Sequence, residues 1–194
     1  MIIKKLIIKN FRSYYGEKVF EFQKGLNLIL GANGDGKTTF FDALDFVFSI
    51  DDVERRSFSY SACVSKKMFS ELAPGATGKV MVSVDVLNSD NRPRTIEREM
   101  EVRKKEDGTM SIVSSSHLGY LPLINGGRKT VMVKDLLYGE GLFPPIIKKY
   151  SLFKGEKALN IFEDKTTLKN LINLFSDIKD LGPYKDFAKF GEDT

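Results

Sequence analysis

One short motif limits the folds open to this chain more than any other feature. GANGDGKT, residues 31–38, matches G-x-x-x-x-G-K-[ST], the pattern of a phosphate-binding loop. A nearly continuous apolar run, GLNLILG at 25–31, precedes it, and residues 37–48 are apolar on almost every side. This context predicts a strand buried on both faces, a glycine loop and a helix buried against a sheet. The alternative is a glycine-rich turn that happens to precede a helix, and the flanking segments argue against it.

Each part of the motif has a chemical role in holding a nucleotide. Glycines let backbone N–H groups converge on phosphate oxygens, and the helix N-terminus adds partial positive charge. Lys37 is predicted to bridge the β- and γ-phosphates and is the candidate catalytic residue. Thr38 is predicted to place its hydroxyl on Mg²⁺, which prefers oxygen ligands, and Thr39 to contact the α-phosphate. The expected cofactors are therefore ATP and Mg²⁺, and the loop residues expected to bind nucleotide are Gly34, Asp35, Gly36, Lys37, Thr38 and Thr39.

Composition narrows the class of protein only slightly. Lys and Arg number 30 against 26 Asp and Glu, a formal charge of +4, which permits contact with nucleic acid without establishing it. Cys63 and His117 are the sole residues of their types, so an internal disulfide is excluded and a His/Cys metal site is disfavoured. We expect both to be structural, in a cytoplasmic protein. No stretch approaches the ~18 apolar residues of a membrane span, so no membrane partner is expected.

Periodicity predicts the remaining elements. Residues 51–70 are polar and predict irregular structure, and 118–130 predict a loop with a turn at INGG. A short helix is predicted within 133–142, and apolar residues at three- and four-residue spacing predict another over 168–181. Alternating residues predict an N-terminal pair of strands and an antiparallel meander in the middle of the chain. The predicted strands span 2–9, 19–22, 79–87, 94–105 and 109–115.

The first fifty residues resemble a known family. KKLIIKNFRSYYGEKVFEFQKGLNLILGANGDGKTTFFDALDFVFS, residues 4–49, is similar to the opening of the SMC/SbcC/RecF-type coiled-coil ABC ATPases. TIEREM, at 95–100, resembles the I-x-R strand of these heads, and SLFKGEKALNIF, at 151–162, resembles the Q-loop segment of DndD-type members. The resemblance implies a mixed α/β P-loop NTPase fold. The chain would form the N-terminal lobe of an ABC-type ATPase head, with an antiparallel β meander and a terminal helix.

The resemblance also implies roles for residues outside the loop. Arg12 matches the NFRS-type position that lies over the nucleotide, and Asn33 the position that faces the γ-phosphate and a partner head. Arg55 or Arg56 matches an arginine that couples DNA to ATP. The alternatives are an ordinary surface arginine at Arg12 and a solvated loop at 55–56. Arg98 is expected to brace the meander rather than to contact a ligand.

The Q-loop position departs from the family pattern. It is occupied by Lys154, and a charged lysine cannot ligate Mg²⁺. Glu156 is then the candidate oxygen donor for the metal, unless this head handles Mg²⁺ differently.

Two motifs needed for hydrolysis in this family are missing. MVSVDV, at 81–86, is the nearest match to a Walker B strand, but Val86 stands where the catalytic Glu should be. INGG, at 124–127, lacks the serine of an LSGG-type signature. We therefore expect residues 1–194 to form one incomplete head with an exposed apolar patch, turning over ATP only with a C-terminal half. Its expected parts are 1–50 (strands, Walker A loop and helix), 51–142 (loop and β meander) and 143–194 (Q-loop-like segment and helical tract).

The resemblance implies action on DNA in repair, chromosome maintenance or defence against foreign DNA. The implied partners are the C-terminal half of the same head, a second head in an ATP-dependent homodimer, double-stranded DNA and a nuclease subunit. The candidate DNA-contacting clusters are 103–105, 128–129 and 148–149. Two other functions stay open: a self-sufficient P-loop kinase, and a nucleotide-binding interaction module that does not hydrolyse ATP.

Overall fold

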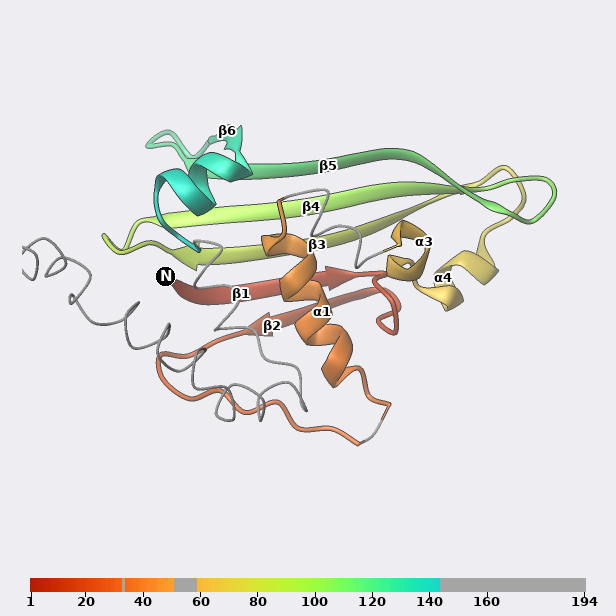
Figure 1. The fold of residues 1–194 in the computed structure, drawn as a ribbon, viewed down its shortest axis with the longest axis horizontal. Helices are drawn as coiled ribbons and strands as arrows, with labels where there is room; N and C mark the ends of the chain where they lie inside the picture. Colours follow the sequence, from red (N-terminus) through yellow and green to blue (C-terminus); the bar gives the residue numbers. More distant parts are fainter. Residues whose placement is uncertain (33, 51–58, 144–194) are drawn as a thin grey trace, which may run out of the picture. The chain divides into compact units, whose positions relative to one another are not determined.

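The computed structural model describes residues 1–32, 34–50 and 59–143. The chain divides into two compact units, Met1–Lys148 and Lys149–Thr194, and every described residue belongs to the first. Within these residues the framework is a six-stranded antiparallel sheet in the order β2-β1-β3-β4-β5-β6 (Figure 1). The strands are β1 (Ile2–Lys9), β2 (Glu17–Glu21), β3 (Thr77–Leu87), β4 (Pro93–Lys104), β5 (Met110–Pro122) and β6 (Arg128–Met132).

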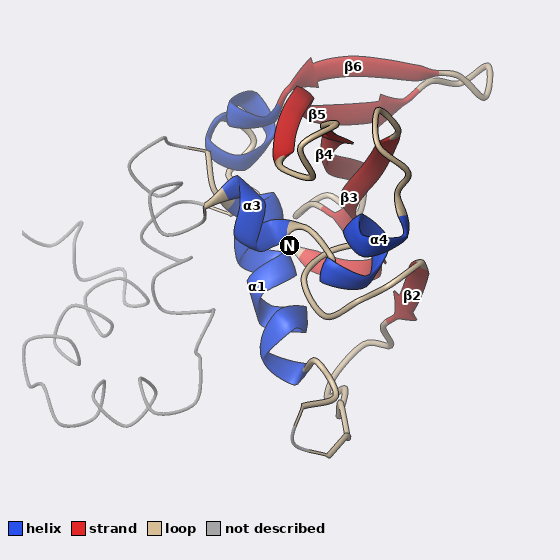
Figure 2. Cartoon of the chain, turned by 90° about the vertical axis from the view of Figure 1, so that its right-hand side faces the viewer, coloured by secondary structure: helices blue, strands red, loops and turns tan. Residues whose placement is uncertain are grey.

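The main helix, α1 (Lys37–Phe48), packs on one face of the sheet against β3 and β4 (Figures 1 and 2). Its bounds are those predicted from the apolar pattern. Two short helices, α3 (Tyr60–Cys63) and α4 (Lys66–Glu71), come between α1 and β3 in the sequence. A π-helical turn, η1 (Asp135–Gly139), follows β6 and confirms the short helix expected there.

The core lies between the sheet and α1. Side chains alternate along a strand, so every second residue of the central strands points towards the helix. Burying each large apolar side chain stabilises the fold by about 1.5–3 kcal/mol. The buried core residues are Leu6, Ile8, Val80, Val82, Val84, Val86, Ile96, Met100 and Val102 from the strands, and Phe40, Ala43, Leu44, Phe46, Val47 and Phe48 from α1.

Two side chains from the sheet hold the C-terminal end of α1. Arg98 of β4, which is 4% exposed, donates from Nη1 to the carbonyl oxygens of Phe46 (2.8 Å) and Ser49 (3.2 Å). His117, directly opposite on β5, places Nε2 2.9 Å from the carbonyl oxygen of Val47. The last carbonyls of a helix have no partner inside it, so these contacts satisfy groups that burial would otherwise leave unpaired. Arg98 and His117 are structural, as expected, but Arg98 braces α1 rather than the meander.

The strand predicted at 25–31 is wrong. Residues 26–31 form no strand, and Leu26, Leu28 and Leu30 are 93%, 74% and 80% exposed. A strand exists only where a neighbour satisfies its backbone groups, and no described strand lies beside this segment. The apolar run is therefore an exposed apolar segment in the described structure.

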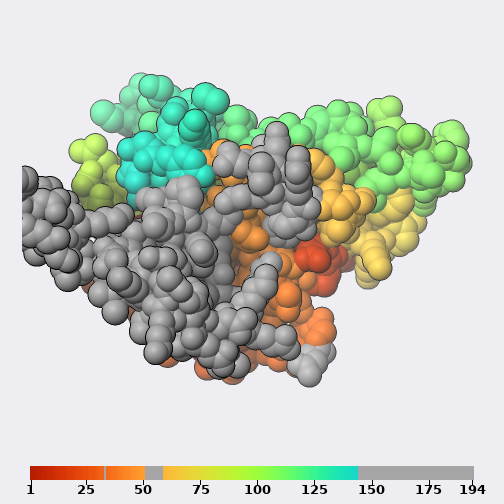
Figure 3. Space-filling model, in the orientation of Figure 1, coloured from red at the N-terminus to blue at the C-terminus, as the bar shows by residue number. Residues whose placement is uncertain are grey.

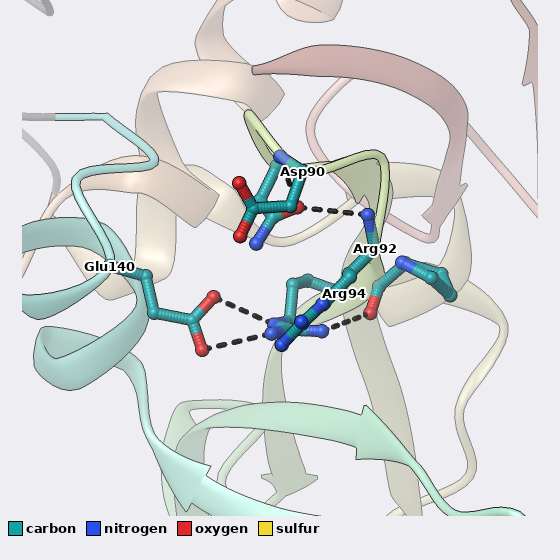
Figure 4. A network of polar contacts seen from close by, with 6 residues as sticks. Asp90, Arg92, Arg94 and Glu140 are labelled. Atoms are coloured by element: carbon teal, nitrogen blue, oxygen red, sulfur yellow. Dashed lines mark hydrogen bonds and ion pairs between the residues drawn. The ribbon is translucent and has the colours of Figure 1, made fainter.

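The loop predicted at 118–130 is wrong on both sides of its turn at INGG, which is confirmed. β5 continues to Pro122, and a turn closed by the hydrogen bond from Leu123 N to Gly127 O (2.8 Å) leads into β6. The chain after η1 is tied back to the sheet at the start of β4. There Arg94 donates to both carboxylate oxygens of Glu140, at 2.8 and 3.1 Å (Figure 4).

The irregular structure predicted over 51–70 is wrong where that segment is described, because α3 and most of α4 fall within it. Several other expectations concern residues outside the described ranges. They are Asn33, Arg55, Arg56, Lys148, Lys149, Lys154, Glu156, the Q-loop-like segment at 151–162 and the helix at 168–181.

Candidate nucleotide-binding site

The loop between β1 and β2, residues 10–16, crosses the N-terminal half of α1, and we call it the strap. Three successive strap residues contact helix positions spaced three apart, so they run along one face of the helix. These contacts are an ion pair, a 2.8 Å hydrogen bond between hydroxyls, and a 3.3 Å hydrogen bond to a backbone carbonyl. The pairs are Arg12 with Asp42, Ser13 Oγ with Thr39 Oγ1, and Tyr14 OH with Gly36 O.

The opposite side of the strap is fixed to the segment that joins α3 to α4. Arg12 N donates to Cys63 O (2.9 Å), and Ser65 N donates to Asn10 O (2.8 Å). Within the strap, Gly16 N donates to the Asn10 side chain (2.8 Å). Asn10 and Arg12 have φ values of 52° and 51°, a region that non-glycine residues rarely occupy. Such backbone persists where surrounding contacts hold it, and it is frequent at functional sites.

The phosphate-binding motif forms a glycine turn that leads into α1. Gly34 and Gly36 have φ values of 98° and 87°, which a residue with a side chain would adopt at a cost. Lys37 folds back over the turn, and its Nζ donates to Gly31 O (2.5 Å) and Ala32 O (2.6 Å). An ammonium group has three donors, so one remains for an anion above the turn.

One hydrogen bond and one steric restriction set the shape of the turn. The Asp35 carboxylate accepts a hydrogen bond from Ala32 N (2.5 Å), which closes the turn on itself. A Cβ on Gly36 would lie 2.9 Å from Ser13 Oγ, closer than such atoms approach. The strap therefore requires glycine at position 36, in addition to the requirement set by its backbone angle.

A cavity of about 690 Å³ adjoins the first turn of α1 on the side of the strap. That volume is in the range of small-ligand sites and suits a nucleoside. Thr38 is exposed there, whereas Thr39 is buried beneath the strap. The lining residues are Arg12, Ser13, Thr38, Thr39, Asp42, Ala62, Val64, Ser65, Lys66 and Lys67.

Burial raises the pKa values of two ionisable groups at the strap and the segment bonded to it. Burial raises the pKa of the Cys63 thiol to about 11, although the charges of Arg12 and Arg98 act in the opposite direction. Burial also raises the pKa of the Tyr14 phenol. The Cys63 thiol is therefore protonated at neutral pH, which agrees with the structural role expected for it.

The structure brings most of the sequence-predicted site together. Arg12, Thr38 and Thr39 line the same cavity, and the turn at 34–37 lies directly before it. Sequence reasoning missed Ser13, Tyr14, Asp42, Val64 and the two lysines of α4. Asp42 had one available signal, because it and Asp45 are the two carboxylates of a helix that is apolar on almost every side. The α4 residues had none, because only the folded chain brings them beside the strap.

The described residues fit Mg²⁺ only as a partner of the nucleotide. Among them, no group of three or more His, Cys, Asp or Glu side chains could hold a metal ion. Thr38 offers one hydroxyl at the start of α1, beside the cavity. Mg²⁺ commonly takes most of its oxygen ligands from water and substrate phosphates, so one hydroxyl beside the turn is compatible with such a site.

Comparison with known families agrees with this geometry. A family model described as an AAA domain matches residues 5–189. The chain belongs to this AAA family. Residues of this AAA domain are 35% identical over 101 positions to the chromosome partition protein Smc of Thermoplasma acidophilum, covering 52% of the chain and 8% of that protein. They are 46% identical over 44 positions to the Rad50 double-strand break repair ATPase of Nanoarchaeum equitans, covering 23% of the chain and 6% of that protein.

Solved structures show the same fold. A chain from work on ATP-driven dimerisation and DNA-stimulated activation of SMC ATPases aligns with a TM-score of 0.53 at 24% identity, covering 88% of this AAA domain and 99% of that chain. The Smc head domain of Pyrococcus yayanosii, with a coiled coil and joint, aligns with a TM-score of 0.50 at 21% identity. The alignment covers 98% of this AAA domain and 35% of that chain.

These likenesses confirm the sequence-based resemblance and the mixed α/β P-loop fold of an SMC-type head. The chain spans less than a tenth of the two relatives named above. Within its described residues, none of the helices has the length and apolar character needed to cross a membrane.

Proposed function

We propose that this AAA domain is the ATP-binding N-terminal half of an SMC-like ATPase head that acts on DNA in the cytoplasm. One observation carries the proposal. The Lys37 turn leads directly into the N-terminus of α1, and the Thr38 and Thr39 side chains at that end line a cavity with room for a nucleoside. Cationic and backbone donors therefore adjoin this cavity. This is the arrangement that a nucleoside triphosphate requires.

Each residue has a defined part in this proposal. The turn at 31–36 presents backbone N–H groups to the phosphates, and Lys37 holds the β- and γ-phosphates with its remaining donor. The Thr38 hydroxyl would join the Mg²⁺ shell. Thr39, whose hydroxyl accepts a hydrogen bond from Ser13, would contact the α-phosphate at the start of α1. Arg12 meets the nucleotide at the cavity. Bound Mg²⁺ would neutralise phosphate charge, and Glu156 remains a candidate ligand.

Hydrolysis is assigned to the head completed by its C-terminal half. Residues 81–86, the nearest Walker B match, lie in β3, where alternate side chains face outward, rather than in a strand buried on both faces. The exposed leucines at 26–30 support the proposal of a second half. Strands supplied by that C-terminal half would pair with the segment and cover these leucines. Two completed heads would then close on ATP as a homodimer.

DNA contact is assigned to basic residues at the ends of the sheet. Arg103 and Lys105 lie at the β4–β5 hairpin, the projecting green end in Figure 3. Lys104 is left out of this assignment, because its Nζ donates to Ser70 O (3.2 Å) and Leu72 O (2.9 Å). Arg128 and Lys129, at the start of β6, form the second cluster, and a nuclease subunit is a further partner in this proposal.

The outer face of the sheet is a poor surface for DNA. Three glutamates of β4 alternate with its buried residues and therefore face away from α1. They are Glu97, Glu99 and Glu101. Glu99 forms an ion pair with Lys79 of β3. The carboxylates of Glu97 and Glu101 would repel phosphates, which favours contact at the sheet ends.

Calorimetry of the full chain with MgATP tests the nucleotide assignment. We expect binding in the wild type, a loss of at least about ten-fold in Lys37→Ala because the β/γ-phosphate contact is gone, and no change in the exposed control Lys24→Ala. ATP turnover is expected only after the C-terminal half is added. Absence of binding in the wild type would contradict the nucleotide site. Turnover by the isolated chain that depends on Lys37 would instead favour a self-sufficient enzyme, and binding without turnover in the completed head would favour an interaction module.

A further inference from the structure

Asp42 is an unusual residue for its position. It lies in the middle of α1, 3% exposed, on a helix whose buried neighbours are mostly apolar. A buried carboxylate is unfavourable unless it is paired. It forms an ion pair with Arg12, whose side chain is 36% exposed and also lines the cavity. The helix therefore contains a buried charge that fixes a cation at the edge of a ligand-sized cavity.

Two of the cations of the site, Lys37 and Arg12, lie at opposite ends of it. Lys37 directs Nζ back to the start of the turn, at Gly31 and Ala32. Arg12 instead lies beside Thr38 and Thr39, in the cavity that suits a nucleoside. Phosphates bound along the turn run from the γ-phosphate near the lysine to the α-phosphate near the start of the helix. The two cations therefore meet different parts of one nucleotide.

Arg12 needs external support to stay in that place. Its backbone is fixed by the bond to Cys63 O, but a long arginine side chain loses conformational entropy when it is ordered. The contact with Asp42 uses Nη1, and a guanidinium carries further donors on Nη2 and Nε. A partner on the helix side can therefore orient the group and leave donors for the cavity.

We propose that Asp42 is a positioning residue for nucleotide recognition. It holds the Arg12 guanidinium so that its remaining donors meet the α-phosphate and ribose end of the nucleotide, the part shared by ATP and ADP. This inference rests on the proposed nucleotide site. It differs from a purely structural role for Asp42, which would support the turn and helix as a whole and so affect every phosphate ligand.

A double-mutant cycle in the full chain tests the proposal, with calorimetry of MgATP, MgADP and pyrophosphate. We expect Asp42→Asn to weaken ATP and ADP about five-fold each, the coupling typical of neighbouring residues, and to leave pyrophosphate, which needs only the Lys37 end, unchanged. Arg12→Ala should weaken both nucleotides at least as much. In the Arg12→Ala background, Asp42→Asn should have no further effect, because Asp42 acts through Arg12.

Two additional variants make the result decisive. Glu140→Gln breaks a comparable arginine pair away from the site and should leave all three affinities unchanged. Asp42→Glu keeps the charge but moves the carboxylate by one methylene, and should weaken ATP and ADP about two-fold with pyrophosphate unchanged. It serves as the test if Asp42→Asn does not fold by circular dichroism.

Three results would overturn the positioning role while the proposed function stands. The first is a loss of pyrophosphate affinity equal to the loss of nucleotide affinity in Asp42→Asn. The others are additive losses of nucleotide affinity in the double variant and tighter nucleotide binding by Asp42→Asn. If the wild type binds none of the three ligands, the proposed function itself fails.

Discussion

The two segments that flank the phosphate-binding turn are both rich in apolar residues, but only one of them is buried. Residues 37–48 and residues 25–31 are both mostly apolar, and both are expected to be buried. The first forms α1 and packs into the core, whereas the leucines of the second are exposed. A helix satisfies its backbone groups within itself and needs only a surface to pack on. A strand needs neighbours, so the same apolar content does not produce the same structure.

The two segments also differ in the contacts that hold them in place. α1 is held by the strap at its N-terminal half and by Arg98 and His117 at its C-terminal end. In the segment at 25–31, the side chain of Asn27 makes local hydrogen bonds, at 2.8–3.2 Å, to the backbone of Gln23 and Gly25. The phosphate-binding turn is therefore anchored from its helix side. Four predictions test this asymmetry.

The largest effect is expected at the C-terminal brace of the helix. Arg98→Met removes a buried guanidinium and leaves the carbonyls of Phe46 and Ser49 without its hydrogen bonds. We expect the free energy of unfolding to fall by about 4 kcal/mol in urea denaturation. The control Arg103→Met, at an exposed position of the same strand, should change it by less than about 0.5 kcal/mol. Equal effects at the two positions would show that α1 does not depend on this brace.

A matched pair of leucines compares the two segments directly. Leu44 of α1 is 5% exposed, and Leu28 is 74% exposed. Leu44→Ala should destabilise the chain by about 3 kcal/mol, because it leaves a cavity in the core. Leu28→Ala should cost less than about 0.5 kcal/mol and should reduce binding of an apolar dye. A large loss of stability in Leu28→Ala would mean that the segment is buried in solution, for example by self-association.

Two glycines of the turn separate backbone strain from contact with the strap. Gly34 and Gly36 both have positive φ, but only at Gly36 would an added Cβ meet strap atoms within 4 Å. We expect Gly34→Ala to cost about 1 kcal/mol from backbone strain alone, and Gly36→Ala about 2 kcal/mol. Thermal unfolding measures the difference. Equal losses would indicate that the strap moves aside without cost.

The smallest effect concerns Cys63 and pH. Its pKa is about 11 in the folded chain against a usual value of 9.0, so the unfolded thiol ionises first as the pH rises. Stability from this group is complete below pH 9 and is lost as the pH rises towards 11. Between about pH 8 and 10 the wild type should lose about 1 kcal/mol relative to Cys63→Ala in urea denaturation. Parallel pH profiles would contradict the burial of this thiol.

The sequence specified those parts of the fold that depend on local pattern. The bounds of α1 and β1 follow from apolar periodicity, and the turn follows from glycines at 34 and 36, where positive φ is required. The loop predicted at 118–130 failed because β6 is short and its alternation is weak. It becomes a strand by pairing with β5, which a local reading does not detect.

The chemistry of the turn was likewise determined by the sequence alone, because adjacent residues supply it. Its surroundings were decided by tertiary structure. The strap and α4 are distant from the turn in sequence, and hydrogen bonds across 22 to 26 positions bring Ser13 and Tyr14 onto the start of α1. The exposure of 26–30 was decided in the same way, since backbone hydrogen bonding in a sheet depends on which strands are adjacent. Local sequence determines which groups are present, and packing determines which of them meet.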